Sequence, residues 1–233
     1  MAKNIKDVLF LSQARLSSER VPGKMMRPFA DTNLVEIVCD KILESKVIPK
    51  ENFYLSAFDN EIKNVAISRG LNVYNRSEKS ALSEGPMQEV MEYHDKLPFK
   101  YVVVISACTP FLSTDTIDKF AKSYLNSDCE GMFGVIPKNN YFWDKDGNLI
   151  TEWPNGQDVL NTKFVGITYE AAHCLYAGRM DLISDGIWMG RAPYTKGNPK
   201  LFPVPEKEVL DIDYEWQFKL AETLYKQGYQ NEL

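Results

Sequence analysis

The sequence predicts an α/β fold of three layers, in which a mostly parallel β-sheet has helices on both faces. Along the first half of the chain, short runs rich in β-branched and aromatic residues alternate with longer stretches in helical apolar spacing. The run Tyr101–Ile105 is apolar throughout, as expected of a central strand that is buried on both faces. The length of 233 residues and a hydrophobic content of 44% suit one large domain, so we expect residues 1–233 to fold as a single unit.

The expected elements follow one another in a regular order. Val8–Gln13 predicts the first strand, and Leu34–Leu43, with apolar residues three and four apart, predicts the first connecting helix. Gly70 would end a second helix over Glu61–Arg69. The other elements expected in this half are strands at 53–56, 73–74, 101–105 and 131–136, and helices at 87–97 and 114–125, the last capped by Ser113 or Thr114. This alternation is typical of parallel βαβ units and therefore of a Rossmann-like sheet.

The pattern changes after residue 138. Asp144–Asn148 reads Asp-Lys-Asp-Gly-Asn, which predicts a hairpin turn, and aromatic residues flank it at Tyr141, Phe142, Trp143 and Trp153. Aromatic side chains on a projecting hairpin favour an interface, and a loop folded back on its own domain is the open alternative. We expect residues 138–178 to form a β-rich insertion within the domain. Beyond the hairpin we expect a strand at 173–177, a short helix at 180–184 and a C-terminal helix at 213–227.

Composition and charge exclude several classes of protein. The net charge of −5 provides no broad basic face for nucleic acid. The chain has no apolar run of membrane-spanning length, and its first residues lack the apolar core of a secretion signal. Its four cysteines are widely spaced without a Cys-x-x-Cys pair, which favours free thiols in a reducing cytosol. We expect a cytoplasmic protein with no nucleic-acid partner and no membrane span.

The segment after the first strand carries groups that bind phosphate. Leu11–Lys24 offers Arg15, Ser17, Ser18, Arg20 and Lys24 within ten residues. Open α/β sheets bind ligands at the carboxyl ends of their strands, where cations, hydroxyls and free backbone N–H groups suit a triphosphate. A solvated surface loop is the alternative, although this segment continues directly from a strand that is expected to be buried.

A pair of carboxylates lies near the C-terminus. In an extended segment Asp211 and Asp213 share one side, whereas Leu210 and Ile212 face the other. Neighbouring carboxylates repel unless a cation neutralises them, and their oxygens next to phosphate suit Mg²⁺. The alternative for Asp213 is the N-cap of the following helix, which leaves Asp211 unexplained.

Both segments resemble one known family. Gln13–Lys24, with the pattern Gln-Ala-Arg-x-x-Ser-x-Arg-x-Pro-Gly-Lys, resembles the signature loop of the sugar-acid cytidylyltransferases. These include the CMP-sialic acid (acylneuraminate) synthetases, the CMP-Kdo synthetases and related spore-coat polysaccharide proteins. Asp211–Glu222 resembles the ending of the same family. The likeness covers most of the chain and is loose between these two segments.

The resemblance implies a CTP-dependent cytidylyltransferase that uses Mg²⁺. Its acceptor would be a 3-deoxy-2-keto sugar acid of the sialic or nonulosonic type, and its products a CMP-sugar for surface polysaccharide or glycan synthesis and pyrophosphate. Arg15, Lys24 and Asp211 would be catalytic, and Asp211 and Asp213 would hold the metal. Nucleotide contacts would come from Gln13, Ala14, Arg15, Ser18, Arg20, Lys24, Arg76, Ser106 and Thr109. The insertion would form a homodimer and close over the partner's active site. A metal hydroxide or an aspartate would take the proton of the attacking hydroxyl.

Several positions depart from the family pattern. Ser106 and Cys108 replace a glutamine and a threonine of the sialate-type synthetases, and Glu19 replaces a lysine. The CMP-Kdo synthetases place an aspartate in the segment of Ser106, and its absence disfavours Kdo. His173 is expected to pack within a strand, although its segment resembles the region that lines the family's sugar pocket. A nucleotidyltransferase for a different surface-sugar precursor and a non-catalytic, CTP-binding dimeric relative therefore stay open. A dinucleotide oxidoreductase is disfavoured, because no Gly-x-Gly-x-x-Gly follows the first strand.

Overall fold

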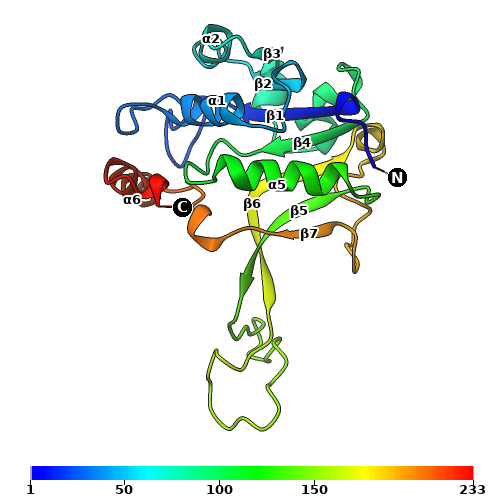
Figure 1. Cartoon of the computed structure of the whole chain (residues 1–233), viewed down its shortest axis with the longest axis vertical. Helices are drawn as coiled ribbons and strands as arrows, with labels where there is room; N and C mark the ends of the chain where they lie inside the picture. The colour runs from blue at the N-terminus through cyan, green and yellow to red at the C-terminus, as the bar shows by residue number, and fades with distance from the viewer. Residues whose placement is uncertain (1, 233) are drawn as a thin grey trace.

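The computed structural model describes residues 2–232, and its centre is one seven-stranded sheet (Figure 1). The strand order is β3-β2-β1-β4-β6-β5-β7. The strands are β1 (Val8–Ala14), β2 (Phe53–Ala57), β3 (Asn72–Asn75), β4 (Tyr101–Ile105), β5 (Met132–Lys138), β6 (Thr168–Arg179) and β7 (Lys200–Pro203). Neighbouring strands are parallel except at β6, which runs antiparallel to both β4 and β5. The expected Rossmann-like, mostly parallel α/β sheet is confirmed.

Helical elements cover both faces of this sheet. The α-helices are α1 (Leu34–Glu44), α2 (Asn60–Ser68), α3 (Glu78–Leu82), α4 (Met87–Val90), α5 (Thr114–Leu125) and α6 (Glu215–Lys226). The 3₁₀ helices are η1 (Ile5–Asp7), η2 (Lys50–Asn52), η3 (Glu92–Asp95), η4 (Met180–Asp185), η5 (Glu206–Glu208) and η6 (Tyr229–Asn231). Alternate residues of β1 serve the two faces, since Phe10 belongs to the core under α1 and α5 whereas Leu9 and Leu11 pack with Tyr93 of η3 and Met180 of η4. In the part of the chain that the structure describes, no helix combines the length and the apolar character needed to cross a bilayer.

The helix expected over 87–97 is interrupted. The helix α4 ends at Val90, and the tighter η3 follows. A continuing α-helix would use the Val90 carbonyl for the amide of His94. That carbonyl accepts instead from Gln13 Nε2 at 3.1 Å, Ser80 Oγ at 3.2 Å and Arg76 Nη2 at 3.4 Å. Side chains from distant segments therefore end this helix.

The strands β5 and β6 continue beyond the sheet as a two-stranded arm, and residues 139–167 form its tip (Figure 1). The expected turn is present there, because the Asp144 carboxylate accepts the backbone N–H groups of Asp146 at 2.9 Å and Asn148 at 2.8 Å. The C-terminal end of the expected insertion over 138–178 belongs to the main sheet, since residues 175–178 pair with β4. The part that projects is therefore shorter than the sequence pattern indicated.

Candidate functional site

Two segments from opposite ends of the chain meet at the carboxyl end of the sheet, on the left in Figure 1. The loop after β1 supplies Arg20, whose Nη2 donates to Asp213 Oδ1 at 2.7 Å across 193 residues of sequence. Lys24 Nζ donates to the carbonyl of Ile212 at 2.5 Å and lies 4.0 Å from Asp213 Oδ1. The basic loop and the acidic pair expected from the sequence thus form one site.

The helix α6 holds the same loop at two further points. The Arg27 guanidinium donates both of its Nη groups to the Glu215 carboxylate at 2.8 Å and stacks 4.3 Å from the centre of the Phe218 ring. The backbone N–H of Ala30 donates to Glu222 at 3.2 Å. A paired, planar contact of this kind fixes orientation as well as distance. The loop that carries Arg20 and Lys24 is therefore anchored along its length.

Asp211 lies on the more buried side of the acidic pair. Burial and the charge of Asp213 raise the pKa of Asp211, and Lys24 acts in the opposite direction. Among residues 2–232, none donates a hydrogen bond to this carboxylate and none forms an ion pair with it. The capping alternative for Asp213 is wrong, because Tyr214 is the N-cap of α6 and the Asp213 carboxylate pairs with Arg20.

The two carboxylates fit a divalent cation that is bound together with phosphate. The described residues contain no group of three or more His, Cys, Asp or Glu side chains that could hold a metal ion. Mg²⁺ does not need such a cage, because it keeps several water ligands and takes phosphate oxygens beside one or two carboxylates. Such a donor set is formed by Asp211, which has no ion-pair partner among the described residues, and Asp213, which has the exposed Arg20 and the largely buried Lys24 as cationic partners.

The loop after β4 forms the next wall of the site. The N–H of Ile212 donates to the carbonyl of Cys108 at 3.0 Å, which joins the acidic segment to this loop. Ser106 Oγ accepts the N–H of Cys108 at 3.1 Å, and the buried Thr109 donates to the Ser106 carbonyl at 3.2 Å. Both hydroxyls therefore shape their own loop. Burial raises the pKa of the Cys108 thiol, which agrees with the expectation that it is not a nucleophile.

A separate group of polar side chains lies on the β2 side of β1, and it consists of the cations Arg15 and Arg76 and the neutral amide of Gln13. Arg15 Nη1 donates to the Ala81 carbonyl at 2.9 Å, away from Lys24 and Asp211. Arg76 is only 7% exposed and donates to Ser80 Oγ at 2.9 Å and to the Ser80 carbonyl at 2.7 Å. Burial and then the charge of Arg15 lower the pKa of Arg76. Arg76 therefore binds backbone carbonyls of the segment that follows β3, at Ser80 and Val90. The structure does not bring it to Lys24.

The two remaining loop positions contribute differently. Ala14 ends β1 and is buried, so only its backbone faces the loop. Ser18 Oγ accepts the N–H of Val21 at 3.4 Å and thereby shapes the turn before Lys24.

Sequence reasoning missed the orientation of His173. A bulge in β6, where the pairing with β5 shifts between Phe133 and Val135, gives His173 a left-handed backbone with φ +51° and an exposed side chain. Its Nδ1 lies 3.3 Å from Tyr176 Oη, and both residues are close enough to Asp211 to interact with its charge. His173 thus lies within a strand as expected, but the expectation that its side chain is packed there is wrong. Bulges often re-aim a side chain beside an active site, but no sequence signal marks this one.

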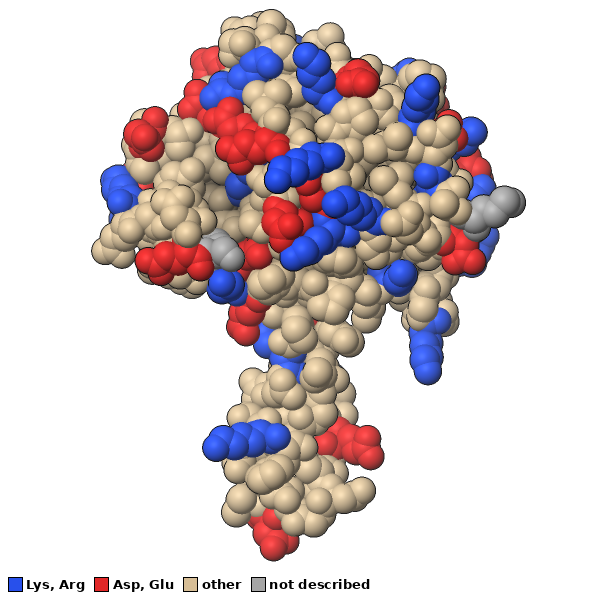
Figure 2. Space-filling view, viewed as in Figure 1, with Lys and Arg blue, Asp and Glu red and all other residues tan. Residues whose placement is uncertain are grey.

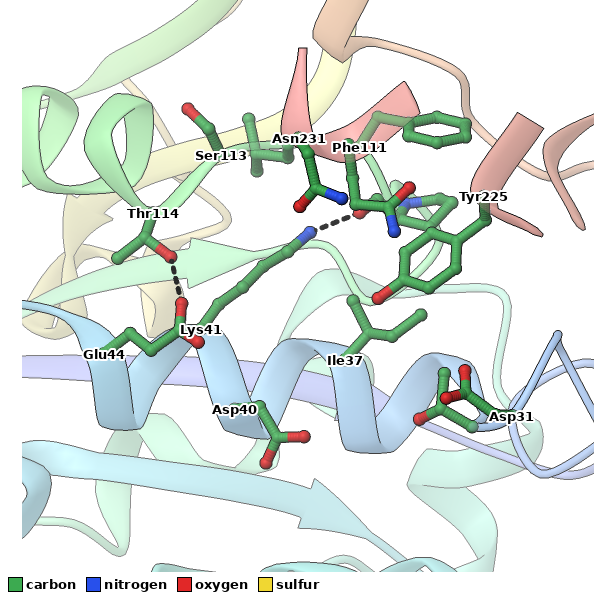
Figure 3. Close-up of a pocket in the computed structure, with 14 residues that line it drawn as sticks. Asp31, Ile37, Asp40, Lys41, Glu44, Phe111, Ser113, Thr114, Tyr225 and Asn231 are labelled. Atoms are coloured by element: carbon green, nitrogen blue, oxygen red, sulfur yellow. Dashed lines mark hydrogen bonds between the residues drawn. The ribbon is translucent and has the colours of Figure 1, made fainter. Parts of the chain in front are cut away.

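A cavity of about 440 Å³ lies elsewhere, between α1, the loop before α5 and the C-terminal segment (Figure 3). Lys41 reaches into it and donates to the Pro110 carbonyl at 2.5 Å. Burial lowers the pKa of Lys41 to about 7. The cavity shares the loop after β4 with the site, but none of the predicted site residues lines it.

Known protein sequences match parts of this chain. A family model described as cytidylyltransferase matches residues 9–153, which is more than half of the chain. The spore coat polysaccharide biosynthesis protein SpsF of Bacillus subtilis (strain 168) is 23% identical over 128 residues. That match covers 52% of this chain and 51% of SpsF, so the chain spans about half the length of this relative.

Solved structures with the same fold cover almost the whole chain. CMP:2-keto-3-deoxy-manno-octonic acid synthetase complexed with CTP has a TM-score of 0.66 at 11% identity and covers 95% of this chain and 99% of its own. The 4-diphosphocytidyl-2C-methyl-D-erythritol synthase of Anaerococcus prevotii DSM 20548 has a TM-score of 0.63 at 14% identity, with 95% and 98% covered. A cytidylyltransferase from Leptospira borgpetersenii serovar Hardjo-bovis (strain JB197) has a TM-score of 0.57 at 18% identity, with 96% of each chain covered. At these identities the likeness shows the fold alone.

Proposed function

The chain belongs to the cytidylyltransferase family, and we propose that it uses CTP to activate a 3-deoxy-2-keto sugar acid of the sialic or nonulosonic type. The products are the CMP-sugar and pyrophosphate. The observation that carries the proposal is the meeting of Arg20 and Lys24 with Asp211 and Asp213 at the carboxyl end of the sheet. Nucleotidyl transfer depends mainly on positioning and on neutralising phosphate charge, and this group supplies cations and hard oxygen ligands side by side.

In the proposed reaction the anomeric hydroxyl oxygen of the sugar acid forms a bond to the α-phosphorus of CTP, and the bond from that phosphorus to the pyrophosphate oxygen breaks. The proton of the hydroxyl passes to an aspartate of the site or to solvent. The phosphates are held by Arg15, Ser18, Arg20 and Lys24. To reach the incoming anion, Arg15 leaves the Ala81 carbonyl, and Arg20 and Lys24 turn from Asp213. Asp211 and Asp213 hold Mg²⁺, which when bound neutralises charge on the phosphates. Lys24, whose Nζ lies 4.0 Å from Asp213 Oδ1, can follow charge as it develops on the phosphates, because a lysine ammonium is a compact charge on a flexible chain.

The names of the relatives support a sugar acceptor. SpsF is named for polysaccharide biosynthesis, and one solved structure is a synthetase for a CMP-linked keto sugar acid. An acceptor of a different class, such as another surface-sugar precursor, uses the same phosphate loop and carboxylates. A non-catalytic relative that only binds CTP is the second alternative, and the departures at Glu19, Ser106 and Cys108 favour it.

We also propose that the arm is the interface of a homodimer. Large apolar side chains are exposed along it, at Phe142, Trp143, Ile150, Trp153, Val159, Leu160, Phe164, Ile167 and Tyr169. The face of the projecting lobe that Figure 2 shows carries few charged side chains. Exposed apolar side chains that gather in one segment are usually covered by a partner, and a second copy of this chain is the occupant that the family resemblance implies.

The experiment that tests the reaction is pyrophosphate release from CTP and Mg²⁺ across a panel of 3-deoxy-2-keto sugar acids. UTP in place of CTP and a metal chelator are the controls. Release that needs CTP, the metal and one sugar acid supports the proposal. CTP binding without release across the panel favours one of the two alternatives, and the absence of CTP binding contradicts the proposal.

A further inference from the structure

A buried carboxylate lies three residues before the acidic pair. Glu208 ends η5 and is only 4% exposed. Its Oε2 accepts the backbone N–H of Ser113 at 2.9 Å, and its Oε1 accepts the hydroxyl of Thr116 at 3.0 Å. Both donors belong to the beginning of α5, where Ser113 is the N-cap. A buried charge is stable only when it is well partnered, and the amino end of a helix favours an anion.

This contact anchors the acidic segment before Asp211. The hydrogen bond from the Ile212 N–H to the Cys108 carbonyl at 3.0 Å anchors it directly after Asp211. Asp211 lies between these two anchors, and no hydrogen bond to its own carboxylate holds it among the described residues. Its position is therefore set by the backbone on either side.

The turn to which Glu208 is anchored is itself held from the opposite side. Lys41 Nζ donates to the Pro110 carbonyl, as the dashed line from Lys41 in Figure 3 shows. The loop between β4 and α5 is thus held by Lys41 on its cavity side and by Glu208 on the side of the acidic segment. Because Lys41 also holds this loop, the loop should stay in place when the contact to Glu208 is lost. The acidic segment would then move relative to the loop.

We propose that Glu208 is a positioning residue of the site. By joining the start of segment 208–213 to the first turn of α5, it sets the place of Asp211 without contacting metal or nucleotide. This inference rests on the proposed function, because the placement of Asp211 matters through the metal that the acidic pair holds.

The test compares Glu208→Gln with Glu206→Gln. Glutamine keeps the shape of Glu208 and one acceptor oxygen, but its amide group cannot accept the second hydrogen bond. Glu206 belongs to the same short helix but is exposed and pairs with Lys138, so Glu206→Gln removes a charge without disturbing the anchor.

The first readout is the hydrogen-exchange rate of the Ile212 amide in the metal-free protein. We expect it to rise about tenfold in Glu208→Gln, as local opening becomes easier by about 1.4 kcal/mol, and to stay unchanged in Glu206→Gln.

The second readout is the Mg²⁺ concentration that gives half-maximal pyrophosphate release. We expect it to rise about tenfold in Glu208→Gln, since losing a supporting contact behind a metal ligand weakens metal affinity by about 10–100-fold, whereas kcat at saturating Mg²⁺ should change by less than about threefold. A folded Glu208→Gln variant with wild-type exchange and wild-type Mg²⁺ dependence overturns the inference. So does a variant with a lower melting temperature but no change in either readout, because that result indicates a role in stability alone.

A second variant keeps the inference testable if Glu208→Gln fails to fold. Thr116→Val removes one hydroxyl donor and leaves the carboxylate and the Ser113 contact in place. It should shift both readouts in the same direction by a smaller factor, and wild-type values for both overturn the inference. If the wild-type protein releases no pyrophosphate, the proposed function fails, whereas the exchange measurement on the metal-free protein still decides the role of Glu208.

Discussion

Asp211 has surroundings that disfavour its own charge. Burial and Asp213 raise its pKa, so an uncharged side chain of the same shape should be tolerated at this position. We predict that Asp211→Asn lowers turnover at least about 100-fold without lowering the melting temperature, because the substitution removes a metal ligand and a like-charge repulsion together. Pyrophosphate release and thermal unfolding measured on the same preparation check both parts.

Two separate lysine substitutions test whether the loss of turnover is specific to the site. Lys24→Ala should also lose turnover, whereas Lys46→Ala, at an exposed lysine outside the site, should keep it. Near-normal activity of Asp211→Asn or Lys24→Ala would contradict the assignment of the site.

Lys41 gives a prediction for stability as a function of pH. Its pKa falls from 10.5 to about 7 in the folded protein because burial disfavours the ammonium, with Glu208 and Glu44 acting in the opposite direction. Between these two values the unfolded chain binds more protons at this position than the folded chain does, so the free energy of unfolding rises with pH. We predict that the free energy of unfolding rises less between about pH 7 and pH 9 in Lys41→Met than in the wild-type protein, because the contribution of the buried thiols, which titrate at lower pH in the unfolded chain, is common to both.

Urea unfolding at a series of pH values measures this slope. The lost hydrogen bond to Pro110 lowers the stability of Lys41→Met at every pH, so the comparison uses the slopes and not the absolute values. Equal slopes for the two proteins would contradict the lowered pKa.

At the scale of the element, the parallel half of the sheet could be predicted because each strand is marked by a local run. The run Tyr101–Ile105 is one example. The strand β7 was not expected, because Pro203 lies in it, and proline is tolerated there only at the edge of the sheet. The reversed direction of β6 depends on how the chain returns from the arm, which no local pattern encodes.

The same division applies to the site. Lys24 and Asp211 were each identified from neighbouring residues, because a cation beside a strand end and a carboxylate pair are local patterns. Glu208 was not, since Glu-Lys-Glu resembles any exposed turn until the fold buries its last residue against α5. Arg76 shows the opposite case, where the resemblance implies a nucleotide contact but burial directs the guanidinium to the protein backbone.

Gly131, directly before β5, packs closely against the backbone of Met189. A Cβ added at Gly131 would overlap the backbone carbonyl of Met189, which has little freedom to move. We predict that Gly131→Ala lowers the free energy of unfolding by about 2–3 kcal/mol. Gly166 is the matched control, because a Cβ there meets nothing within 4 Å and Gly166→Ala should change stability by less than about 0.5 kcal/mol. Equal stabilities of the two variants in urea unfolding would show that the loop before β7 does not pack on β5 as described.

At the scale of the whole molecule, the arm projects from the sheet, and many of its apolar side chains do not pack against other parts of the described chain. Ile150 is 68% exposed and Leu160 is 62% exposed, which is unusual for side chains of this kind unless another surface covers them. A charge at either position should leave the folded chain intact, because neither side chain contributes to its core. The substitutions therefore separate assembly from folding.

We predict that the wild-type protein has about twice the chain mass of 26.7 kDa in solution, and that Ile150→Glu combined with Leu160→Glu has the mass of one chain. Ile67→Glu is the matched control, since Ile67 is 60% exposed on α2, away from the arm, and this variant should remain a dimer. Light scattering after size-exclusion chromatography measures the three masses. If the arm also closes over the partner's site, the double variant loses turnover together with dimerisation, whereas Ile67→Glu keeps both. A monomeric wild-type protein, or a double variant that stays dimeric, would contradict the proposal that the arm is the dimer interface.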